Sequence, residues 1–271
     1  MTVPAGCVFL LTDYGYGDEL AGVLRAAVVS AAPAAPVVDL THGIAPFDVV
    51  GGARALARCV PHLGPGVVVG VVDPGVGTSR RAVAVEVDAS PRYLVGPDNG
   101  LLMEGATTLG GPRRAVALRR SDLVTVRTFD GRDVFAPVAA ALWAGADLAD
   151  VGCAIDVDGL VGLPDPVLQV GRGELRAEVT WVDRFGNVQL AACPSDAEAA
   201  GLGADGAAVT VVIGGTREQA IRVASFAGAG SGLGLLVDAN GRLALVLDRS
   251  SAAQLLDVRV GDLVDLLGNS G

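Results

Sequence analysis

Two hydrophobic patterns alternate through the first half of the chain. Short, continuous apolar runs are typical of strands buried on both faces of a sheet, and the stretches between them have the i, i+3, i+4 spacing of helices. The strand-like runs cover 7–12, 37–42, 66–73, 82–88 and 92–96. The helix-like stretches cover 18–33, 47–63 and 135–148. This alternation predicts an α/β domain with a mainly parallel central sheet.

The pattern changes in the second half of the chain. Residues 156–175 are rich in Gly, Pro and Asp and show no long helical spacing, which is typical of a linker. Short strand-like runs with Gly-Gly and Asn-Gly turn signals follow, at 175–182, 187–192, 208–213, 219–224, 233–237 and 243–247. They predict a smaller antiparallel β domain, either a barrel or a sandwich. The predicted organisation is an α/β domain over 1–160, a linker over 161–174 and a β domain over 175–271.

Composition narrows the class of ligand. Hydrophobic residues make up 51% of the 271 residues and charged residues 18%, as expected of a globular chain with a substantial core. The net charge of −10 disfavours nucleic acid or an anionic membrane as a partner and suits a cationic or neutral small molecule. Every basic residue is an arginine, which excludes lysine Schiff-base chemistry and a Walker-type phosphate loop.

Cysteine spacing and the N-terminus bear on compartment. The four cysteines, at 7, 59, 153 and 193, form no CxxC pair, so we expect buried free thiols and neither a zinc site nor a disulfide framework. The two histidines are not clustered, so no metal site is expected. The N-terminus has no basic region, and no apolar stretch approaches the roughly 18 residues of a membrane helix. These features predict a soluble cytoplasmic protein.

Polar residues collect where the predicted strands end. In open α/β sheets, ligands bind outside the carboxyl ends of the strands. A single Asp at such a position is usually a turn residue or a helix cap, but five loops on one edge predict an acidic, glycine-lined cleft. The five loops contain Asp13, His42, Asp73, the "GPDNGLL" segment at 96–102 and the "TFDGRD" segment that begins at 128.

Individual residues of this edge suggest roles. Asp13 has the chemistry to bind a ribose diol, because a carboxylate accepts two hydroxyl hydrogen bonds at once, and Asp18 has the charge to meet an ammonium group. Either Arg80 or Arg81 is placed to fold back onto Asp73. His42, after a buried strand, is interpreted as a hydrogen-bonded structural residue rather than a base.

The C-terminal half offers candidate nucleoside contacts. In "TWVDRFGNV" (180–188), Phe185 is suited to stacking on a purine, and Asn187 matches the donor and acceptor edge of adenine. An ordinary β-turn explains the same segment equally well. "VASFAGAGSGLG" supplies Phe226, but its glycines do not follow the dinucleotide-binding fingerprint.

The ordered set of motifs is more specific than any of its members. "TDYG", "VVDLTHGIAPFDV", "VVDPGVGTSRR", "GPDNGLL", "TFDGRDVFAP" and "VDRFGNV" together resemble the S-adenosyl-L-methionine (SAM) hydroxide adenosyltransferase family, relatives of the SAM-dependent fluorinase and chlorinase. The resemblance implies an N-terminal α/β domain, a C-terminal β-barrel, and a homotrimer that binds SAM between neighbouring subunits. It also implies attack of water or hydroxide on the ribose C5′, releasing adenosine and methionine without a cofactor.

The resemblance also assigns residues. Asp73 and Arg80 match two members of the family's Asp–Arg–His triad, and Asp130 stands at the triad's third position. Asp13 matches the carboxylate that binds the ribose diol. Other positions match contacts to the methionine amino group or the nucleoside, or lie beside the triad or in the C-terminal domain. These predicted substrate-binding residues are Asp18, Phe47, Thr128, Phe129, Gly131, Asp183, Phe185, Asn187, Phe226 and Asn240.

Three departures from the family pattern bear on function. Asp130 replaces the triad histidine, and an ordinary Asp, titrating near 3.9, is a weaker base at neutral pH than a histidine near 6.5. The family's "NS-x-G" motif, whose serine helps to hold the methionine carboxylate, is Asp-Ala239-Asn240-Gly here. Its Thr-Asn pair after "FGN" is Leu190-Ala191. The last two changes concern the amino-acid end of the substrate.

Three functions follow from these observations. The leading hypothesis is a SAM hydrolase that uses Asp73, Arg80 and Asp130, slowed by the loss of the histidine. A non-catalytic protein that binds SAM or adenosine is the alternative from another class. A SAM-dependent halogenase is disfavoured, because its relatives carry an aromatic residue at the position of Asp73 and two carboxylates repel an incoming halide.

Overall fold

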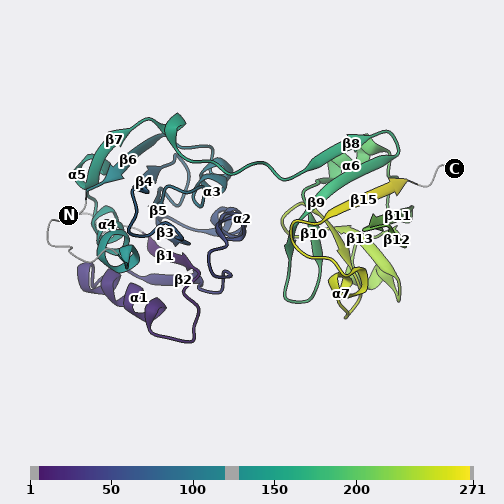
Figure 1. Cartoon of the computed structure of the whole chain (residues 1–271), viewed down its shortest axis with the longest axis horizontal. Helices are drawn as coiled ribbons and strands as arrows, with labels where there is room; N and C mark the ends of the chain where they lie inside the picture. The colour runs from purple at the N-terminus through teal and green to yellow at the C-terminus, as the bar shows by residue number, and fades with distance from the viewer. Residues whose placement is uncertain (1–5, 120–127, 269–271) are drawn as a thin grey trace. The chain divides into compact units, whose positions relative to one another are not determined.

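The computed structural model describes residues 6–119 and 128–268, which fold into two units. The first unit is Met1–Leu163 and the second is Pro164–Gly271 (Figure 1). The boundary between them falls within the stretch predicted to be a linker. Part of that stretch is nevertheless regular structure, because Leu168–Gly171 forms strand β8 and pairs with the strand that follows.

The first unit contains a seven-stranded sheet in the order β2-β1-β3-β5-β4-β6-β7 (Figure 1). Strands β2, β1, β3 and β5 are parallel neighbours, whereas β4, β6 and β7 continue the sheet through antiparallel pairs. The α/β prediction is confirmed, with a mixed sheet whose first four strands are parallel. The strands are β1 (Cys7–Thr12), β2 (Val37–Thr41), β3 (Gly66–Val71), β4 (Ala82–Glu86), β5 (Tyr93–Pro97), β6 (Arg114–Leu118) and β7 (Gly152–Ile155).

Helices cover both faces of this sheet. Helices α1 (Leu20–Ala31) and α4 (Ala136–Trp143) lie on one face, and α2 (Val49–Cys59) and α3 (Met103–Thr108) lie on the other (Figure 1). Strand β1 contributes side chains to the hydrophobic cores on both faces of the sheet. Its Val8 and Leu10 join the core beneath α1 and α4, whereas Phe9 and Leu11 join the core beneath α2 and α3. Burial on both faces is the reason that the strand is continuously apolar.

One predicted helix differs in a way that matters for the site. The apolar pattern predicts a helix over 135–148, but the helical segment begins earlier, as a π-helix at Gly131–Phe135 that runs directly into α4. It ends at Trp143, and the short α5 (Leu148–Val151) follows. A π-helix is rare and often marks a functional site. Here it begins immediately after Asp130.

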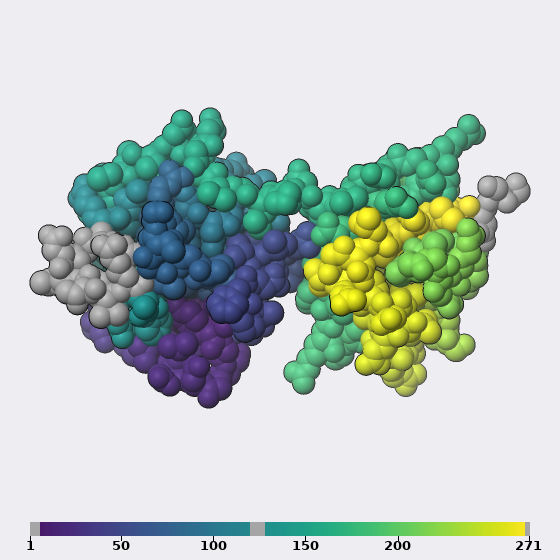
Figure 2. All heavy atoms as spheres, in the orientation of Figure 1, coloured from purple at the N-terminus to yellow at the C-terminus, as the bar shows by residue number. Residues whose placement is uncertain are grey.

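The second unit is a closed β-barrel. Its strands run β10-β14-β13-β12-β11-β15-β9, and the pairing of β9 with β10 closes the ring, which decides between the barrel and the sandwich. All pairs in the ring are antiparallel except β12 with β13. Figure 2 shows the C-terminal residues, in yellow, spread over the visible face of this unit. The strands are β9 (Glu174–Val182), β10 (Val188–Leu190), β11 (Ala208–Ile213), β12 (Thr216–Arg222), β13 (Leu233–Val237), β14 (Leu243–Val246) and β15 (Leu263–Gly268).

Several short elements carry too little pattern to be predicted. They are α3, β6 and β7 in the first unit, and α6 (Pro194–Ala200), α7 (Ala252–Leu256) and β15 in the second. Short 3-10 turns at Val60–His62, Val157–Gly159 and Phe226–Ala229 complete the described structure.

The cysteines are free thiols, as predicted, but they are not all buried. Cys153 is exposed, because β7 is the edge strand of its sheet, and the other three are half-buried. Among the described residues, no helix is long and apolar enough to cross a membrane.

Not every carboxylate of the predicted acidic edge faces a ligand. Asp98, directly after β5, is buried; its Oδ2 accepts a hydrogen bond from Arg81 Nε at 2.7 Å, and its Oδ1 accepts one from the Val161 N–H at 2.9 Å. Asp98 therefore ties the end of β5 to the last residues of the first unit.

Replacing this carboxylate should cost stability. Asp98→Ala leaves the Val161 N–H without its acceptor and removes the partner of Arg81, so we expect the free energy of unfolding to fall by about 1–3 kcal/mol. Urea denaturation followed by circular dichroism measures the change. Asp88→Ala is the matched control, because the Asp88 side chain is 75% exposed. Equal unfolding midpoints for Asp98→Ala and wild type would contradict this role.

Candidate active site

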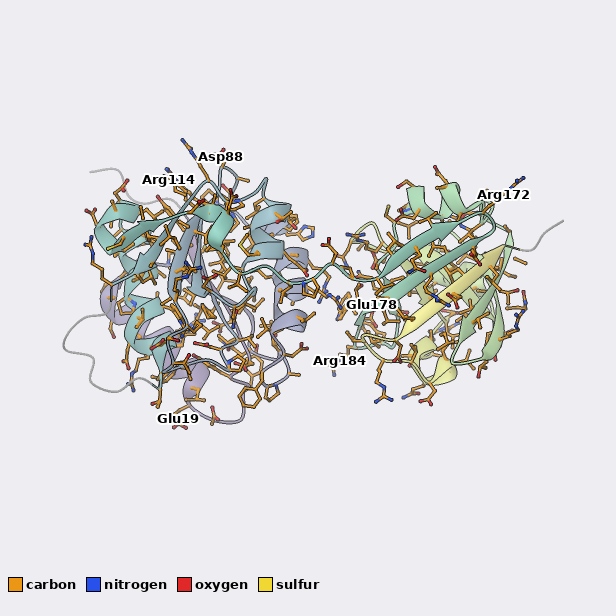
Figure 3. The ribbon with its side chains drawn as sticks, turned by 45° about the horizontal axis from the view of Figure 1, so that its top comes forward. Glu19, Asp88, Arg114, Arg172, Glu178 and Arg184 are labelled. Atoms are coloured by element: carbon orange, nitrogen blue, oxygen red, sulfur yellow. The ribbon has the colours of Figure 1, made fainter. Side chains whose placement is uncertain are left out.

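The candidate site lies at one end of the first sheet. Asp13 directly follows β1, and Asp73 lies two residues after the end of β3. Arg80 lies two residues before β4, which runs antiparallel to β5, so all three residues reach the same edge of the sheet. In Figure 3, Glu19 marks this end, and Asp88 and Arg114 mark the opposite end of the sheet. The carboxyl ends of parallel strands are where ligands bind in such folds.

At this edge, Arg80 bridges two buried carboxylates. Its Nε donates to Asp73 Oδ1 at 3.1 Å, and its Nη2 donates both to Asp73 Oδ2 and, at 2.8 Å, to Asp130 Oδ2. The side chains of Asp73, Arg80 and Asp130 are only 5%, 8% and 1% exposed. We call these three residues the carboxylate cluster. It joins the loop after β3 to the start of the π-helix.

The guanidinium of Arg80 is held on its other sides as well. Its Nη1 donates to the Arg81 carbonyl at 3.0 Å, and its Cζ lies 5.6 Å from the centre of the Phe135 ring. Of the two arginines expected to fold back onto Asp73, Arg80 does so, and Arg81 pairs with Asp98 instead.

Opposing effects act on the pKa of Asp73. Burial raises the pKa of Asp73, and the charge of Asp130 raises it further, whereas Arg80 and the Gly75 N–H lower it; the net pKa is raised. One guanidinium thus serves two carboxylates in a site poor in water. A carboxylate with a raised pKa is a stronger base than an ordinary one.

Asp13 shapes the neighbouring loop. Its Oδ2 accepts a hydrogen bond from the Phe47 N–H at 2.9 Å. Phe47 has φ 68, in the left-handed region that non-glycine residues seldom adopt, and its ring is exposed. The hydrogen bond that Phe47 donates to Asp13 therefore supports a strained residue whose ring is available to a ligand. Two predicted substrate contacts, Asp13 and Phe47, lie side by side.

Tyr14 is a member of the site that the sequence interpretation did not single out. Its ring packs edge-to-face on Phe129, with centroids 5.5 Å apart. Burial raises the pKa of Tyr14, and the charges of Asp13, Asp73 and Asp130 raise it further. The available signal was its position, directly after Asp13 at the end of a buried strand.

Other predicted residues of this unit have local roles. Asp18 Oδ1 accepts from the Leu20 N–H at 3.0 Å, at the start of α1. Arg132 pairs with its neighbour Asp133, as a turn interpretation of that segment predicts. Thr128 is exposed beside Phe129, and Gly131 is buried.

His42 is a structural residue, as predicted. It is buried, its Nδ1 lies 2.7 Å from Thr12 Oγ1, and its Nε2 lies 3.4 Å from Asp39 Oδ1. Both ring nitrogens therefore have partners within the fold. Within the described residues, no group of three or more His, Cys, Asp or Glu side chains is arranged to hold a metal ion.

In the second unit, Asp183 organises the turn between β9 and β10. Its Oδ1 accepts from the Phe185 N–H at 2.8 Å and the Asn187 N–H at 2.9 Å, and its Oδ2 accepts from Asn187 Nδ2 at 2.7 Å. These bonds orient the Asn187 amide and hold the Phe185 ring 75% exposed. The turn interpretation and the binding prediction are compatible, because a rigid turn presents an aromatic ring and an amide.

The remaining predicted contacts of the second unit lie on two other turns. Phe226 begins a 3-10 turn, and its side chain is half-exposed. Asn240 is exposed, and its N–H donates to Asp238 Oδ1 at 2.8 Å. Asp238 Oδ2 in turn accepts from Gln189 Nε2 at 2.6 Å, so this turn is tied to β10.

Fold and site together define a two-unit protein of the α/β-plus-barrel class with a buried carboxylate cluster at the carboxyl edge of its sheet. Residues 8–152 match the family model of the SAM hydroxide adenosyltransferase N-terminal domain, and residues 177–265 match that of the C-terminal domain. The chain belongs to the SAM hydroxide adenosyltransferase family.

Relatives extend over nearly the whole chain. A protein named (R)-S-adenosyl-L-methionine hydrolase from Salinispora arenicola is 45% identical over 93% of this chain and 94% of its own length. One of the same name from Salinispora tropica is 42% identical over 96% and 97%. A fluorinase from an Actinoplanes species is 27% identical over 72% and 74%. A crystal structure of an uncharacterised conserved protein from Thermotoga maritima covers 96% of this chain and 99% of its own, with a TM-score of 0.89 and 30% identity.

The raised pKa of Asp73 predicts a stability cost at neutral pH. The native state holds a proton on Asp73 more tightly than the unfolded chain, so ionising Asp73 above its raised pKa lowers the free energy of unfolding. We expect Asp73→Asn to be more stable than wild type at pH 7, since Arg80 keeps Asp130 as its partner. The gain should shrink as the pH falls toward about 4, where an ordinary Asp becomes protonated in both states.

Urea unfolding of both proteins between pH 4 and pH 8 measures this difference. The exposed Asp88→Asn serves as the control and should follow wild type throughout. If the free energy of unfolding changed with pH in the same way for Asp73→Asn and wild type, the claim that burial of the ionised Asp73 carboxylate costs stability would be contradicted.

Proposed function

We propose that this chain hydrolyses SAM to adenosine and L-methionine by attack of water on the ribose C5′. The observation that carries the proposal is the carboxylate cluster, in which Arg80 holds Asp73 and Asp130 at the carboxyl edge of the sheet. Family membership and relatives named as SAM hydrolases support it. A negative cluster in a chain of net charge −10 also suits a cationic sulfonium.

The substrate contacts follow from the chemistry of each residue. Asp13 keeps acceptor capacity for the ribose hydroxyls, and Phe47 offers its exposed ring beside it. The preorganised turn of the second unit offers Phe185 and Asn187 to the adenine. The further substrate contacts that we propose are Asp18, Thr128, Phe129, Gly131, Asp183, Phe226 and Asn240.

The reaction requires little acid catalysis. As the water oxygen bonds to C5′, the C5′–S bond breaks and its electron pair neutralises the sulfonium, so the leaving thioether needs no proton. The proton lost by the water goes to a carboxylate of the cluster, and we assign Asp73 as the acceptor because its pKa is raised. Arg80 keeps both carboxylates oriented toward the same point.

The proposal needs no cofactor, because the sulfonium of the substrate is itself the activated group. SAM or adenosine is the proposed small-molecule partner. We place the protein in the cytoplasm, supported by four cysteines that are all free.

The distant fluorinase relatives raise the question of a halide nucleophile. A halide entering this site would meet Asp73 and Asp130, which share the guanidinium of Arg80, and like charges at short range repel strongly in a buried site. Water carries no such penalty and has a proton to give to a carboxylate. The electrostatics therefore favour hydrolysis.

Incubation of the purified chain with SAM tests the activity directly. We expect adenosine and methionine in equal amounts, and loss of at least about 100-fold of the rate in Asp73→Asn, which keeps the shape but removes the base. Chromatography of the products measures both, with Asp88→Asn as control. Calorimetric binding of SAM without turnover would identify a non-catalytic binding protein instead, and 5′-halogenated adenosine in excess halide would identify a halogenase.

Restoring an imidazole at position 130 tests whether a second proton acceptor beside Asp73 speeds the reaction. We expect Asp130→His to release adenosine faster than wild type around neutral pH, because an imidazole titrates near 6.5 and an ordinary carboxyl group near 3.9. Initial rates between pH 5 and pH 9 measure the effect. Unchanged rates across this range would show that the base does not act at position 130.

A homotrimer with substrate sites at the subunit interfaces is the assembly that we propose, on the strength of the family resemblance. Light scattering after size-exclusion chromatography should give about three times the 27.2 kDa of one chain. A mass of one or two chains at micromolar concentration would contradict this assembly.

A further inference from the structure

Tyr14 lies at the centre of the candidate site without a role in the chemistry described so far. It sits between Asp13 and Gly15, where β1 has just ended, and its N–H donates to Thr12 Oγ1 at 3.1 Å. Its ring meets the Phe129 ring edge-to-face at an interplanar angle of 79°. The phenol is therefore anchored from both its backbone and its ring.

The hydroxyl of Tyr14 points at the chain next to Asp130. A Cβ added to Gly131 would lie 2.3 Å from the Tyr14 hydroxyl oxygen, so the oxygen occupies the space that a side chain at position 131 would fill. Gly131 directly follows Asp130 and begins the π-helix. The close approach places the Tyr14 hydroxyl beside the carboxylate cluster, and only glycine at position 131 permits it.

This hydroxyl is open to a further hydrogen-bond partner. Across residues 6–119 and 128–268, no protein group forms a hydrogen bond with it. In the same residues, every fully buried side-chain oxygen or nitrogen has a hydrogen-bond partner. The Tyr14 oxygen is therefore not fully buried, and it lies beside Gly131, the residue that follows Asp130. A water bound to the phenol there would lie next to the carboxylate cluster.

Burial and the charges around Tyr14 favour the protonated form of its phenol. Asp13, Asp73 and Asp130 each disfavour a phenolate, as burial does, and Arg80 is paired with two of them. Because its pKa is raised above the ordinary value, the phenol keeps its proton at neutral pH and is not a base. Its hydroxyl has one hydrogen to donate, and a water oxygen can accept it.

We propose that Tyr14 is a further catalytic residue, whose hydroxyl donates a hydrogen bond to the attacking water and holds it against Asp73 and Asp130. The inference rests on the proposed SAM hydrolysis and adds to it a positioned nucleophile. The water accepts from Tyr14 with one lone pair and donates one hydrogen to a carboxylate, which leaves its second lone pair for C5′. When C5′–O forms and C5′–S breaks, the water proton passes to the carboxylate and the Tyr14 proton stays in place.

Tyr14→Phe tests the inference, since it removes the hydroxyl and keeps the ring on Phe129. We expect kcat for adenosine release to fall about 10- to 100-fold, and KM to change less than about threefold, because the lost bond acts on the water rather than on SAM. The unfolding midpoint and the calorimetric affinity for SAM should stay at wild-type values. Tyr93→Phe, at the opposite end of the sheet, is the matched control and should keep wild-type kcat.

The outcomes separate the inference from the function on which it rests. Adenosine release by wild type with kcat of Tyr14→Phe within about twofold would overturn the role of Tyr14 and leave the hydrolase intact. A raised KM at unchanged kcat, or a loss of SAM affinity, would make Tyr14 a substrate-binding or structural residue and also overturn it. If wild type releases no adenosine, the proposed function fails first and the inference fails with it.

Discussion

The Arg80 guanidinium between two buried carboxylates is the constraint on which the site depends. It joins the loop after β3, the two residues before β4 and the residue that precedes the π-helix. Buried charges are costly unless they are paired, so each segment is held where its charge can reach the others. Loss of Arg80 would remove the guanidinium that Asp73 and Asp130 share. The proposed catalytic residues are therefore also the residues that hold this edge of the sheet together.

Burial and the neighbouring Asp130 raise the pKa of Asp73, and this raised pKa links stability to the proposed function. A hydrophobic or fully paired arrangement would be more stable, but it would offer no base and no attraction to a cation. Other carboxylates of the chain show the opposite solution. Asp98 and Asp183 are satisfied by N–H groups and a guanidinium or amide of their own surroundings, and they act as ties within the fold. What distinguishes Asp73 is not its residue type or its position after a strand but its burial next to a second carboxylate, Asp130, that shares its guanidinium.

Much of the fold could be predicted because its elements carry strong local patterns. The run at 7–12 became β1 with the same bounds, and the stretch at 18–33 became α1 at Leu20–Ala31. Prediction failed where the pattern was short or irregular. Helix α3 has six residues, β15 follows a region without a clear turn signal, and the π-helix before α4 has no periodicity of its own in the sequence. The predicted linker contained β8 because a Gly- and Pro-rich composition does not prevent pairing with a neighbouring strand.

The sequence by itself determined the α/β and β division of the chain, the acidic character of the sheet edge and the ordered motifs of the family, since periodicity, charge and motif order are local properties. Residue chemistry left Arg80 and Arg81 equivalent, although the family resemblance named Arg80. The tertiary structure shows that Arg80 meets Asp73, and it alone decided that Tyr14 points at Gly131. Arg80 and Arg81 are adjacent and chemically identical, and Asp130 is 50 residues from Arg80 along the chain. Which of them pair depends on strand order and on the face each side chain takes, and these are set by the packing of the whole sheet.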